Sequence, residues 1–377
     1  MYLIFAPQKK FSLIPPGDYI MSPEVRFWKN IAFCQKQYWF KLHKDHGCVD
    51  ITPRFMRRLR AKRELLRIVV VATGGLGDSL WIMPFVRELR RLWPRSAILV
   101  VTETRNKPAW INFPYINGLI SDAYYSMESA MTKSDEAYCF GGVATVYKQY
   151  MRKDPVEAVF DMAEIPAPKD HRLMRPHLVI TIDEGKKAEA FLKEHGIEIK
   201  RDKIICIGAE SSTNNRNWPI EYMIETSRQL AGSGYKVIWL GKTPELAEKV
   251  LKAEYKVPGV LNLIDDTGLR QAMSIIALSD LYIGPNSALM VIAAALEIPT
   301  IGLFGSFNPK IRCKFYTKFL PIWGRAKCSP CNEHWTECPH GHPAPCMKVI
   351  SPGEVIPAAA SMIKRYPREL QNKNPIE

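Results

Sequence analysis

Leu66-Arg67-Ile68-Val69-Val70-Val71-Ala72-Thr73-Gly74-Gly75-Leu76-Gly77-Asp78-Ser79 is the stretch that decides the fold of this chain. Its first half is a nearly continuous apolar, β-branched run, which is typical of a strand buried on both faces of a parallel sheet. A helix is predicted from Asp78 to about Trp93, because apolar residues recur at every third position and Pro94 follows. A further strand over residues 97–102 would complete a βαβ unit.

A second turn, Gly284-Pro285-Asn286-Ser287-Ala288, also follows an apolar run and precedes a helical pattern. A helix that begins directly after a parallel strand offers unpaired backbone N–H groups and the positive end of its dipole, which suit an anion such as phosphate. Two such turns, about 200 residues apart, predict an α/β protein with two Rossmann-like, doubly wound domains that face a cleft.

Four parts of the chain are expected. Residues 1–65 form a helical extension, and residues 66–180 form the N-terminal Rossmann-like domain. Strands and helices alternate again in residues 181–350, which form the C-terminal domain, and the Pro-rich passage near residues 165–176 reads as the linker. The pattern Ser-Pro-Gly-Glu at 351–354 predicts a capping box and a final helix over 352–366, which we expect to join the N-terminal domain.

Composition limits the class of protein. The chain has 377 residues, of which 47% are hydrophobic and 24% charged, so it is globular rather than disordered. It contains no apolar stretch of 18 or more residues that would span a membrane, and the N-terminus does not read as a signal peptide. We therefore expect a cytoplasmic protein, peripheral to the inner membrane if it contacts one.

The extension carries much of the net charge of +14, with thirteen Lys and Arg against five Asp and Glu in residues 1–65. Aromatic residues are interleaved with these cations. Ser22-Pro23 and Thr52-Pro53 read as helix starts. The extension either packs on the main body or contacts a membrane surface or a second copy of the chain. No nucleic-acid-binding module is recognisable, so no nucleic-acid partner is expected.

A cysteine cluster spans residues 328–346. Four thiols within 19 residues, with a close first pair, favour a structural zinc or iron site that is not part of the chemistry. Disulfides or free thiols are the alternatives, and a histidine inside the loop could replace one thiol. The predicted ligands are Cys328, Cys331, Cys338 and Cys346, and the histidines are His334, His340 and His342.

Three motifs resemble the heptosyltransferase family, glycosyltransferase family 9. They are the turn at 75–79, Arg216-Asn217-Trp218-Pro219, and Ser287 with the segment from Ala293 to Gly305. The resemblance covers about residues 66–366. It implies a GT-B fold and an inverting, metal-independent transfer of a heptose-like sugar from a nucleoside-diphosphate sugar, bound by the C-terminal domain, to a lipopolysaccharide-type glycan or lipid-linked acceptor.

The resemblance also implies roles for single residues. Asp78 would be the general base that takes the proton of the acceptor hydroxyl, although a carboxylate at this position also suits a helix cap. Arg216 would bind the departing diphosphate with its guanidinium group, together with the backbone N–H groups of Ser287 and Ala288 and the Ser287 hydroxyl.

The remaining predicted donor-binding residues lie in turns, and each has a plain structural reading. Glu245 would bind ribose hydroxyls or simply begin a surface helix, and Thr267-Gly268 would line the nucleotide pocket or form a turn. The same choice between donor contact and turn holds for Asn286. The set of predicted donor-binding residues is completed by the two glycines of the first turn, Gly75 and Gly77.

Two positions at the second turn depart from the family pattern, and Arg216 stands where the family usually has Lys, which keeps the charge but not the geometry. Asn286 and Val291 stand where the family usually has an Asp and a His beside the donor diphosphate. These departures favour an alternative, a catalytically silent GT-B protein that binds a ligand or scaffolds an assembly. A protein O-glycosyltransferase of the same fold is a further alternative.

Overall fold

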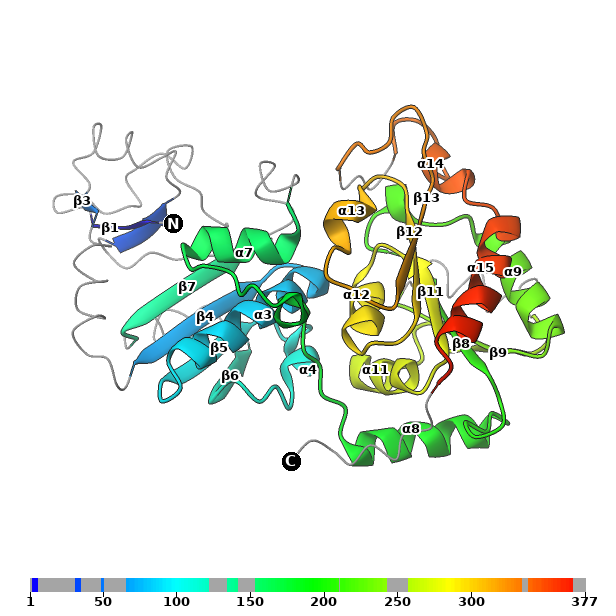
Figure 1. Ribbon diagram of the computed structural model, residues 1–377, viewed down its shortest axis with the longest axis horizontal. Coiled ribbons are helices and arrows are strands. Elements are labelled where there is room, and N and C mark those ends of the chain that lie inside the picture. The colour runs from blue at the N-terminus through cyan, green and yellow to red at the C-terminus, as the bar shows by residue number, and fades with distance from the viewer. Residues whose placement is uncertain are drawn as a thin grey trace. The chain divides into compact units, whose positions relative to one another are not determined.

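A computed structural model describes residues 2–5, 31–34, 49–50, 66–121, 134–141, 153–209, 211–242, 257–333 and 338–368. The chain divides into two compact units (Figure 1). The N-terminal unit comprises Met1–Trp110, Pro114–Val146 and Val156–Met174, and the C-terminal unit comprises Ile111–Phe113, Tyr147–Pro155 and Arg175–Glu377. We expected this division at about residue 180.

The N-terminal unit is built on a four-stranded parallel sheet with the order β6-β5-β4-β7. Its strands are β4 (Arg67–Thr73), β5 (Ala97–Thr102), β6 (Gly118–Ser121) and β7 (Glu136–Gly141). Its helices are α3 (Leu76–Leu92), α4 (Lys107–Trp110), α7 (Pro155–Ala163) and the 3-10 turn η4 (His171–Met174). The predicted βαβ unit is thus present as β4, α3 and β5.

Aromatic side chains fix α3 and α7 to this sheet. The ring of Phe85 on α3 lies edge-on to Tyr138 and Phe140 of β7, with centroids 4.9 and 5.1 Å away, and to Phe160 of α7 at 5.6 Å. Edge-to-face pairs of this kind add to the free energy of simple burial. They lock the helix that begins at the glycine-rich turn.

The described part of the extension consists of strands, whereas we expected helices. β1 (Tyr2–Phe5), β2 (Ile31–Cys34) and β3 (Val49–Asp50) form an antiparallel sheet with the order β2-β1-β3. The helices expected to start at Ser22 and Thr52 lie outside the described residues. Among the residues that are described, none belongs to a helix with the length and apolar character needed to cross a membrane.

The C-terminal unit contains a six-stranded, all-parallel sheet with the order β10-β9-β8-β11-β12-β13. The strands are β8 (Ile204–Gly208), β9 (Lys236–Leu240), β10 (Val260–Asn262), β11 (Leu281–Pro285), β12 (Thr300–Phe304) and β13 (Phe319–Trp323). The helices are α8 (Ile182–Glu194), η5 (Asn214–Arg216), α9 (Ile220–Gly232), α11 (Leu269–Ala277), α12 (Ala288–Ala295), α13 (Pro309–Arg312), α14 (Pro345–Lys348) and α15 (Pro352–Arg365).

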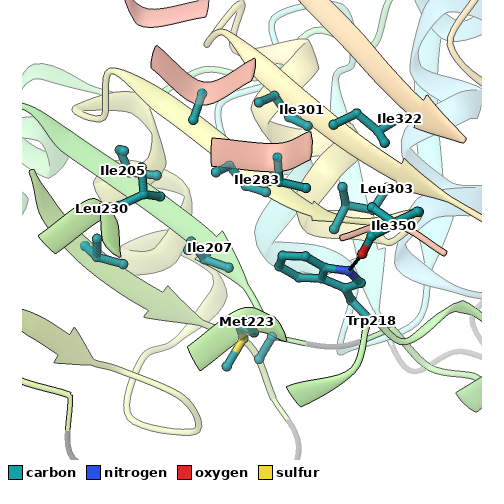
Figure 2. Packing of buried hydrophobic residues seen from close by; sticks show 14 of the residues in the cluster. Ile205, Ile207, Trp218, Met223, Leu230, Ile283, Ile301, Leu303, Ile322 and Ile350 are labelled. Carbon is teal, nitrogen blue, oxygen red and sulfur yellow. Dashed lines mark hydrogen bonds between the residues drawn. The ribbon is translucent and has the colours of Figure 1, made fainter. Parts of the chain in front are cut away.

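Helices cover both faces of this sheet, with α11 and α12 on one side and α9 and α15 on the other (Figure 1). The core on the α9 and α15 side gathers apolar residues from β8, β9, β11 and β12. Figure 2 shows Trp218 inside this core, where its Nε1–H donates to the carbonyl oxygen of Ile350 at 2.8 Å. The tryptophan of the Arg-Asn-Trp-Pro motif is therefore a structural anchor that holds Arg216 beside the sheet.

The final helix differs from our expectation in two ways. We expected it to join the N-terminal domain, but the structure assigns α15 to the C-terminal unit. Val355, Ala359 and Met362 form a buried stripe in the core of that unit, and this stripe decides where the helix packs. Ser351 is its N-cap residue, but the hydroxyl makes no capping hydrogen bond, so the predicted capping box is not formed.

Glycines lie close together where the central strands of the six-stranded sheet end. Gly284 of β11 and Gly302 of β12 are partners in the register, and Gly208 ends β8 on the other side of β11. A Cβ atom at Gly208 would lie 2.0 Å from the hydroxyl oxygen of Tyr282, and one at Gly302 would lie 2.5 Å from Phe319. These glycines leave room for aromatic rings to lie flat on the sheet.

A half-buried ion pair joins α8 to α11. Arg270 Nε donates to Glu184 Oε1 at 2.7 Å, and Arg270 Nη2 donates to the other carboxylate oxygen and, at 2.8 Å, to the carbonyl of Val179. Hydrogen bonding from Arg270 is the main reason that the pKa of Glu184 falls to about 2. Because this value lies below that of an unfolded glutamate, the pair stabilises the fold above about pH 4.5 and loses its effect as the pH falls toward 2.

Glu184→Gln is therefore expected to lower the free energy of unfolding by roughly 1–2 kcal/mol at pH 7. The deficit relative to the parent chain should shrink as the pH falls from about 4.5 to 3. Urea unfolding at several pH values measures both. Asp183→Asn is the matched control, because the Asp183 side chain is 72% exposed and its pair with Lys187 should contribute less than about 0.5 kcal/mol. A deficit independent of pH would contradict this account.

Candidate functional site

Arg216 is a buried, hydrogen-bonded side chain at the carboxyl end of the six-stranded sheet. It is 8% exposed, and its guanidinium group donates to Asn286 O at 2.6 Å, Thr213 Oγ1 at 2.7 Å and Ser212 Oγ at 2.9 Å. These contacts join the loop after β8 to the loop after β11. Because Arg remains protonated in proteins, they fix a positive charge between two strand ends.

The second predicted turn lies next to this charge. Asn286 is buried, its N–H donates to Leu303 O at 3.2 Å, and its carbonyl accepts from Arg216. Ser287 is the N-cap residue of α12, and Ala288 is the first residue of the helix. The structure therefore brings together Arg216, Asn286, Ser287 and Ala288, as the sequence predicts, in an arrangement suited to an anion.

Val291 brings no polar group to this turn. Its side chain is 1% exposed, and it belongs to the buried face of α12. The positive features of the turn are therefore backbone N–H groups and Arg216, with no imidazole from this position.

Asp78 lies at the other predicted turn, in the N-terminal unit. Its carboxylate accepts a hydrogen bond from Gly75 N at 3.1 Å, so it caps α3 at the third helical position. Two side chains from the segment after β5 hold the backbone of this turn. The Glu103 carboxylate accepts a hydrogen bond from Gly74 N, and the Asn106 amide donates one to Gly74 O, both at 3.0 Å. The structure thus shows the capping contact of Asp78, and its role as a base stays a prediction.

The two glycines of that turn have ordinary backbone conformations at the start of α3. A Cβ atom at Gly75 would lie 3.1 Å from the Asp78 carboxylate, whereas one at Gly77 would meet no atom within 4 Å. Gly75 therefore leaves room for the capping carboxylate. A donor contact of either glycine stays a prediction.

Two further predicted donor residues, Thr267 and Gly268, lie in the loop after β10. Gly268 is the N-cap residue of α11, and Thr267 precedes it, half-buried. The neighbouring Asp265 N donates to Gly241 O at 3.0 Å, so the loops after β9 and β10 lie side by side at the carboxyl end of the sheet. Glu245 lies outside the described residues, and its role stays a prediction.

The comparisons with known proteins identify the family of this chain. The profile of the family described as Glycosyltransferase family 9 (heptosyltransferase) matches residues 143–340, which is more than half of the chain. The chain belongs to glycosyltransferase family 9. The Salmonella typhimurium protein called Lipopolysaccharide heptosyltransferase 2 is 31% identical to it over 161 residues, which are 41% of this chain and 45% of that protein. The matched part thus spans less than half the length of that relative.

Solved structures support the fold of this family 9 glycosyltransferase. The E. coli ADP-heptose lipopolysaccharide heptosyltransferase II covers 80% of this chain and 99% of its own, with a TM-score of 0.59 and 18% identity. The iron-containing dodecameric glycosyltransferase TibC of enterotoxigenic E. coli covers 80% and 77%, with a TM-score of 0.60 and 14% identity. These likenesses show the GT-B fold, in agreement with our prediction.

The cysteine cluster of the family 9 chain lies over the end of β12. Asn332 N donates to Ser306 O at 2.8 Å, and Asn215 Nδ2 donates to Glu333 O at 2.7 Å, so the loop also touches the segment that carries Arg216. Cys346 packs where a Cβ atom on Gly305 would lie 2.6 Å from its sulfur. Burial raises the pKa of Cys346 to about 11, and the thiols of Cys328, Cys331 and Cys338 add to this effect.

A metal site at these thiols is not supported. In the part of the chain that is described, no three His, Cys, Asp or Glu side chains come together as a group that could hold a metal ion. The described cysteines are free thiols, which was one of the alternatives, and His334 lies outside the described residues. Close spacing of cysteines along the chain is therefore not enough to assign them as metal ligands.

Sequence reasoning missed Ser212 and Thr213 in this family 9 site. The two hydroxyl residues orient Arg216, and the signal for them was the polar run directly before the Arg-Asn-Trp-Pro motif.

Proposed function

We propose that this family 9 protein is an inverting glycosyltransferase that transfers a heptose-like sugar from a nucleoside-diphosphate sugar to a lipopolysaccharide-type or other cell-surface glycan acceptor. The observation that carries the proposal is the buried Arg216, held by three oxygen acceptors beside the first turn of α12. A buried cation next to a helix N-terminus stabilises a departing diphosphate.

In this proposal the C-terminal unit binds the donor. Arg216 and the first backbone N–H groups of α12 bind the diphosphate oxygens, and the loop at Thr267-Gly268 contacts the nucleoside. Since Arg216 and the helix dipole supply positive charge at this point, we propose that the transfer needs no divalent metal ion. The cysteine cluster has no part in the chemistry.

The N-terminal unit supplies the base. Asp78 is half-buried, and its carboxylate is fixed at the first turn of α3 by Gly75 N. A fixed carboxylate can take the proton of an acceptor hydroxyl as the new glycosidic bond forms. We propose that Asp78 has this role in addition to capping the helix.

The charge of the extension is the basis of our proposal for location and assembly. Its excess of Lys and Arg suits the anionic cytoplasmic face of the inner membrane, where a lipid-linked acceptor would be found. We propose that residues 1–65 make a peripheral contact with this surface or join copies of the chain.

Ligand binding and turnover test the function. The full-length chain is mixed with ADP, UDP or GDP, and its thermal unfolding is followed; a nucleotide at about 100 times its dissociation constant should add about 2.7 kcal/mol of stability. Because the E. coli structure is titled an ADP-heptose enzyme, ADP is the first nucleotide to test. Transfer from ADP-heptose to heptose-deficient lipopolysaccharide, in EDTA, is then followed by mass spectrometry. Absence of binding by all three nucleotides would contradict the proposal.

A catalytically silent binding protein is the second candidate. It is favoured by Asn286 and the buried Val291, which bring neither a carboxylate nor an imidazole to the turn before and within α12. Tight nucleotide binding without transfer or donor hydrolysis would support this candidate over the enzyme.

A further inference from the structure

The first part of the cysteine cluster, residues 328–333, is hydrogen-bonded to the chain directly after β12. We call this segment the cysteine loop. The Ser329 hydroxyl donates to the carbonyl oxygen of Gly305. Three residues later, Asn332 N donates to the carbonyl oxygen of Ser306 at 2.8 Å. Bonds to two consecutive carbonyl groups fix the cysteine loop against the carboxyl end of the six-stranded sheet.

The cysteine loop continues from β12 to the turn that carries Arg216. Asn332 has a left-handed φ of 57°, which asparagine adopts more readily than most residues. The next carbonyl oxygen, that of Glu333, accepts a hydrogen bond from Asn215 Nδ2 at 2.7 Å. Asn215 is the middle residue of η5, and Arg216 is the last. The cysteine loop thus joins the end of β12 to η5.

The side chain of Asn215 is buried with only part of its hydrogen-bonding capacity used. The residue is 1% exposed, and its Oδ1 makes no hydrogen bond of normal geometry with any residue that the structure describes. An amide buried with an unpaired oxygen costs free energy, so this residue is a poor choice for stability alone. Departures of this kind are expected where a side chain serves a functional site.

The effect of the Asn215 bond reaches Arg216 through the backbone of the short turn. Arg216 N donates to Thr213 O, and Asn217 N donates to Asn214 O, both at 3.1 Å. Because these bonds enclose Asn215, a shift of its side chain moves the whole turn. A guanidinium group binds phosphate oxygens as a planar fork, so its orientation matters as well as its charge.

We propose that Asn215 is a positioning residue for the diphosphate of the donor: its bond to Glu333 O ties the turn of Arg216 to the cysteine loop, which braces that turn against the end of β12. This inference rests on the proposed function. Asn215 itself does not touch the ligand. It gives the cysteine loop a role in donor binding that needs neither a metal ion nor a reactive thiol.

The test uses ADP and inorganic pyrophosphate as probes, measured by calorimetry on the full-length chain. Asn215→Ala should raise the dissociation constants for both probes about fivefold, because the turn loses its tie to the cysteine loop. The unfolding midpoint should change by less than about 2 °C, since the unpaired Oδ1 is removed together with the bond. Ser329→Ala frees the other end of the brace and should weaken the binding of both probes about threefold.

A double variant shows whether Asn215 acts through the guanidinium group. Lysine at position 216 is a flexible point charge that does not depend on the orientation of a planar fork. In the Arg216→Lys background, Asn215→Ala should therefore change the affinity for either probe by less than about twofold. A residue that only supports packing would weaken binding equally in both backgrounds.

Two control variants separate positioning from general stability. Ser227→Ala removes a buried hydroxyl that donates to Met223 O and accepts from Trp239 Nε1, so it should lower the unfolding midpoint without changing affinity. Asn117→Ala removes an amide oxygen of the N-terminal unit that accepts from Ile98 N at 2.9 Å, and the same result is expected.

Each further outcome decides the matter. If Asn215→Ala or Ser329→Ala binds both probes like the parent, the positioning role is wrong while the proposed function stands. The same conclusion follows if Asn215→Ala weakens binding as much with Lys as with Arg at position 216. If the parent chain binds neither ADP nor pyrophosphate, both proposals are wrong.

Discussion

Asp78→Asn is expected to lower kcat for sugar transfer by about 10²- to 10⁴-fold while changing the free energy of unfolding by less than about 0.5 kcal/mol. The two effects separate because the residue has two roles. An asparagine oxygen can still accept the hydrogen bond from Gly75 N, which the carboxylate accepts at 3.1 Å. An amide cannot take the proton of the acceptor hydroxyl, so the substitution slows the chemical step and leaves the stability of the fold almost unchanged.

Steady-state kinetics and urea unfolding of the same preparation measure this split. Asp78→Ala is the companion variant, because it removes both roles and should cost about 1 kcal/mol of stability as well. Asp266→Asn, an exposed carboxylate of the C-terminal unit, is the control for a general change of charge. If Asp78→Asn keeps kcat within twofold, Asp78 only caps α3 and the base lies elsewhere.

Arg216→Ala is expected to lower kcat/KM by about 10²- to 10³-fold and the affinity for the nucleoside diphosphate with it. The guanidinium group is the positive side chain at the turn before α12, and its bonds to Thr213, Ser212 and Asn286 fix its orientation before any ligand arrives. The substitution also leaves these three acceptors without their donor, which should cost roughly 1–3 kcal/mol of stability.

Arg216→Lys distinguishes charge from geometry. Lysine keeps the charge but not the planar fork, so we expect activity between those of the parent and the alanine variant. Arg228→Ala, on the exposed side of α9, is the control and should retain activity. Full activity of Arg216→Ala, with nucleotide affinity unchanged, would refute the assignment of the diphosphate site to this turn.

The regular elements around the two turns could be predicted because their signals are local. The apolar run at 66–72 and the helix pattern after it predicted β4 and α3 to within a few residues. Elements with conflicting signals were missed. β13 contains Pro321, which a strand accepts at the edge of a sheet, and β13 is an edge strand.

Long-range packing limited the rest of the prediction. α8 was missed because the Pro-rich passage before it reads as a linker, although Thr181 and Glu184 form a true capping box. The prediction that the final helix packs on the N-terminal domain was wrong, because the apolar stripe of a helix does not show which sheet the helix will cover. Arg216, Asn286 and Ser287 were predicted because polar residues at strand ends point to a site, whereas the hydrogen bonds of Ser212 and Thr213 to Arg216 form only in the folded chain.

The glycines at the ends of the central strands also restrict how the protein can be engineered. Gly208, Gly284 and Gly302 each face an aromatic ring so closely that even alanine would displace it. A mutagenesis library intended to change donor preference should therefore hold these three codons constant. Diversity is better placed at Thr267 and Gly268, whose loop adjoins the site without supporting the floor of the sheet.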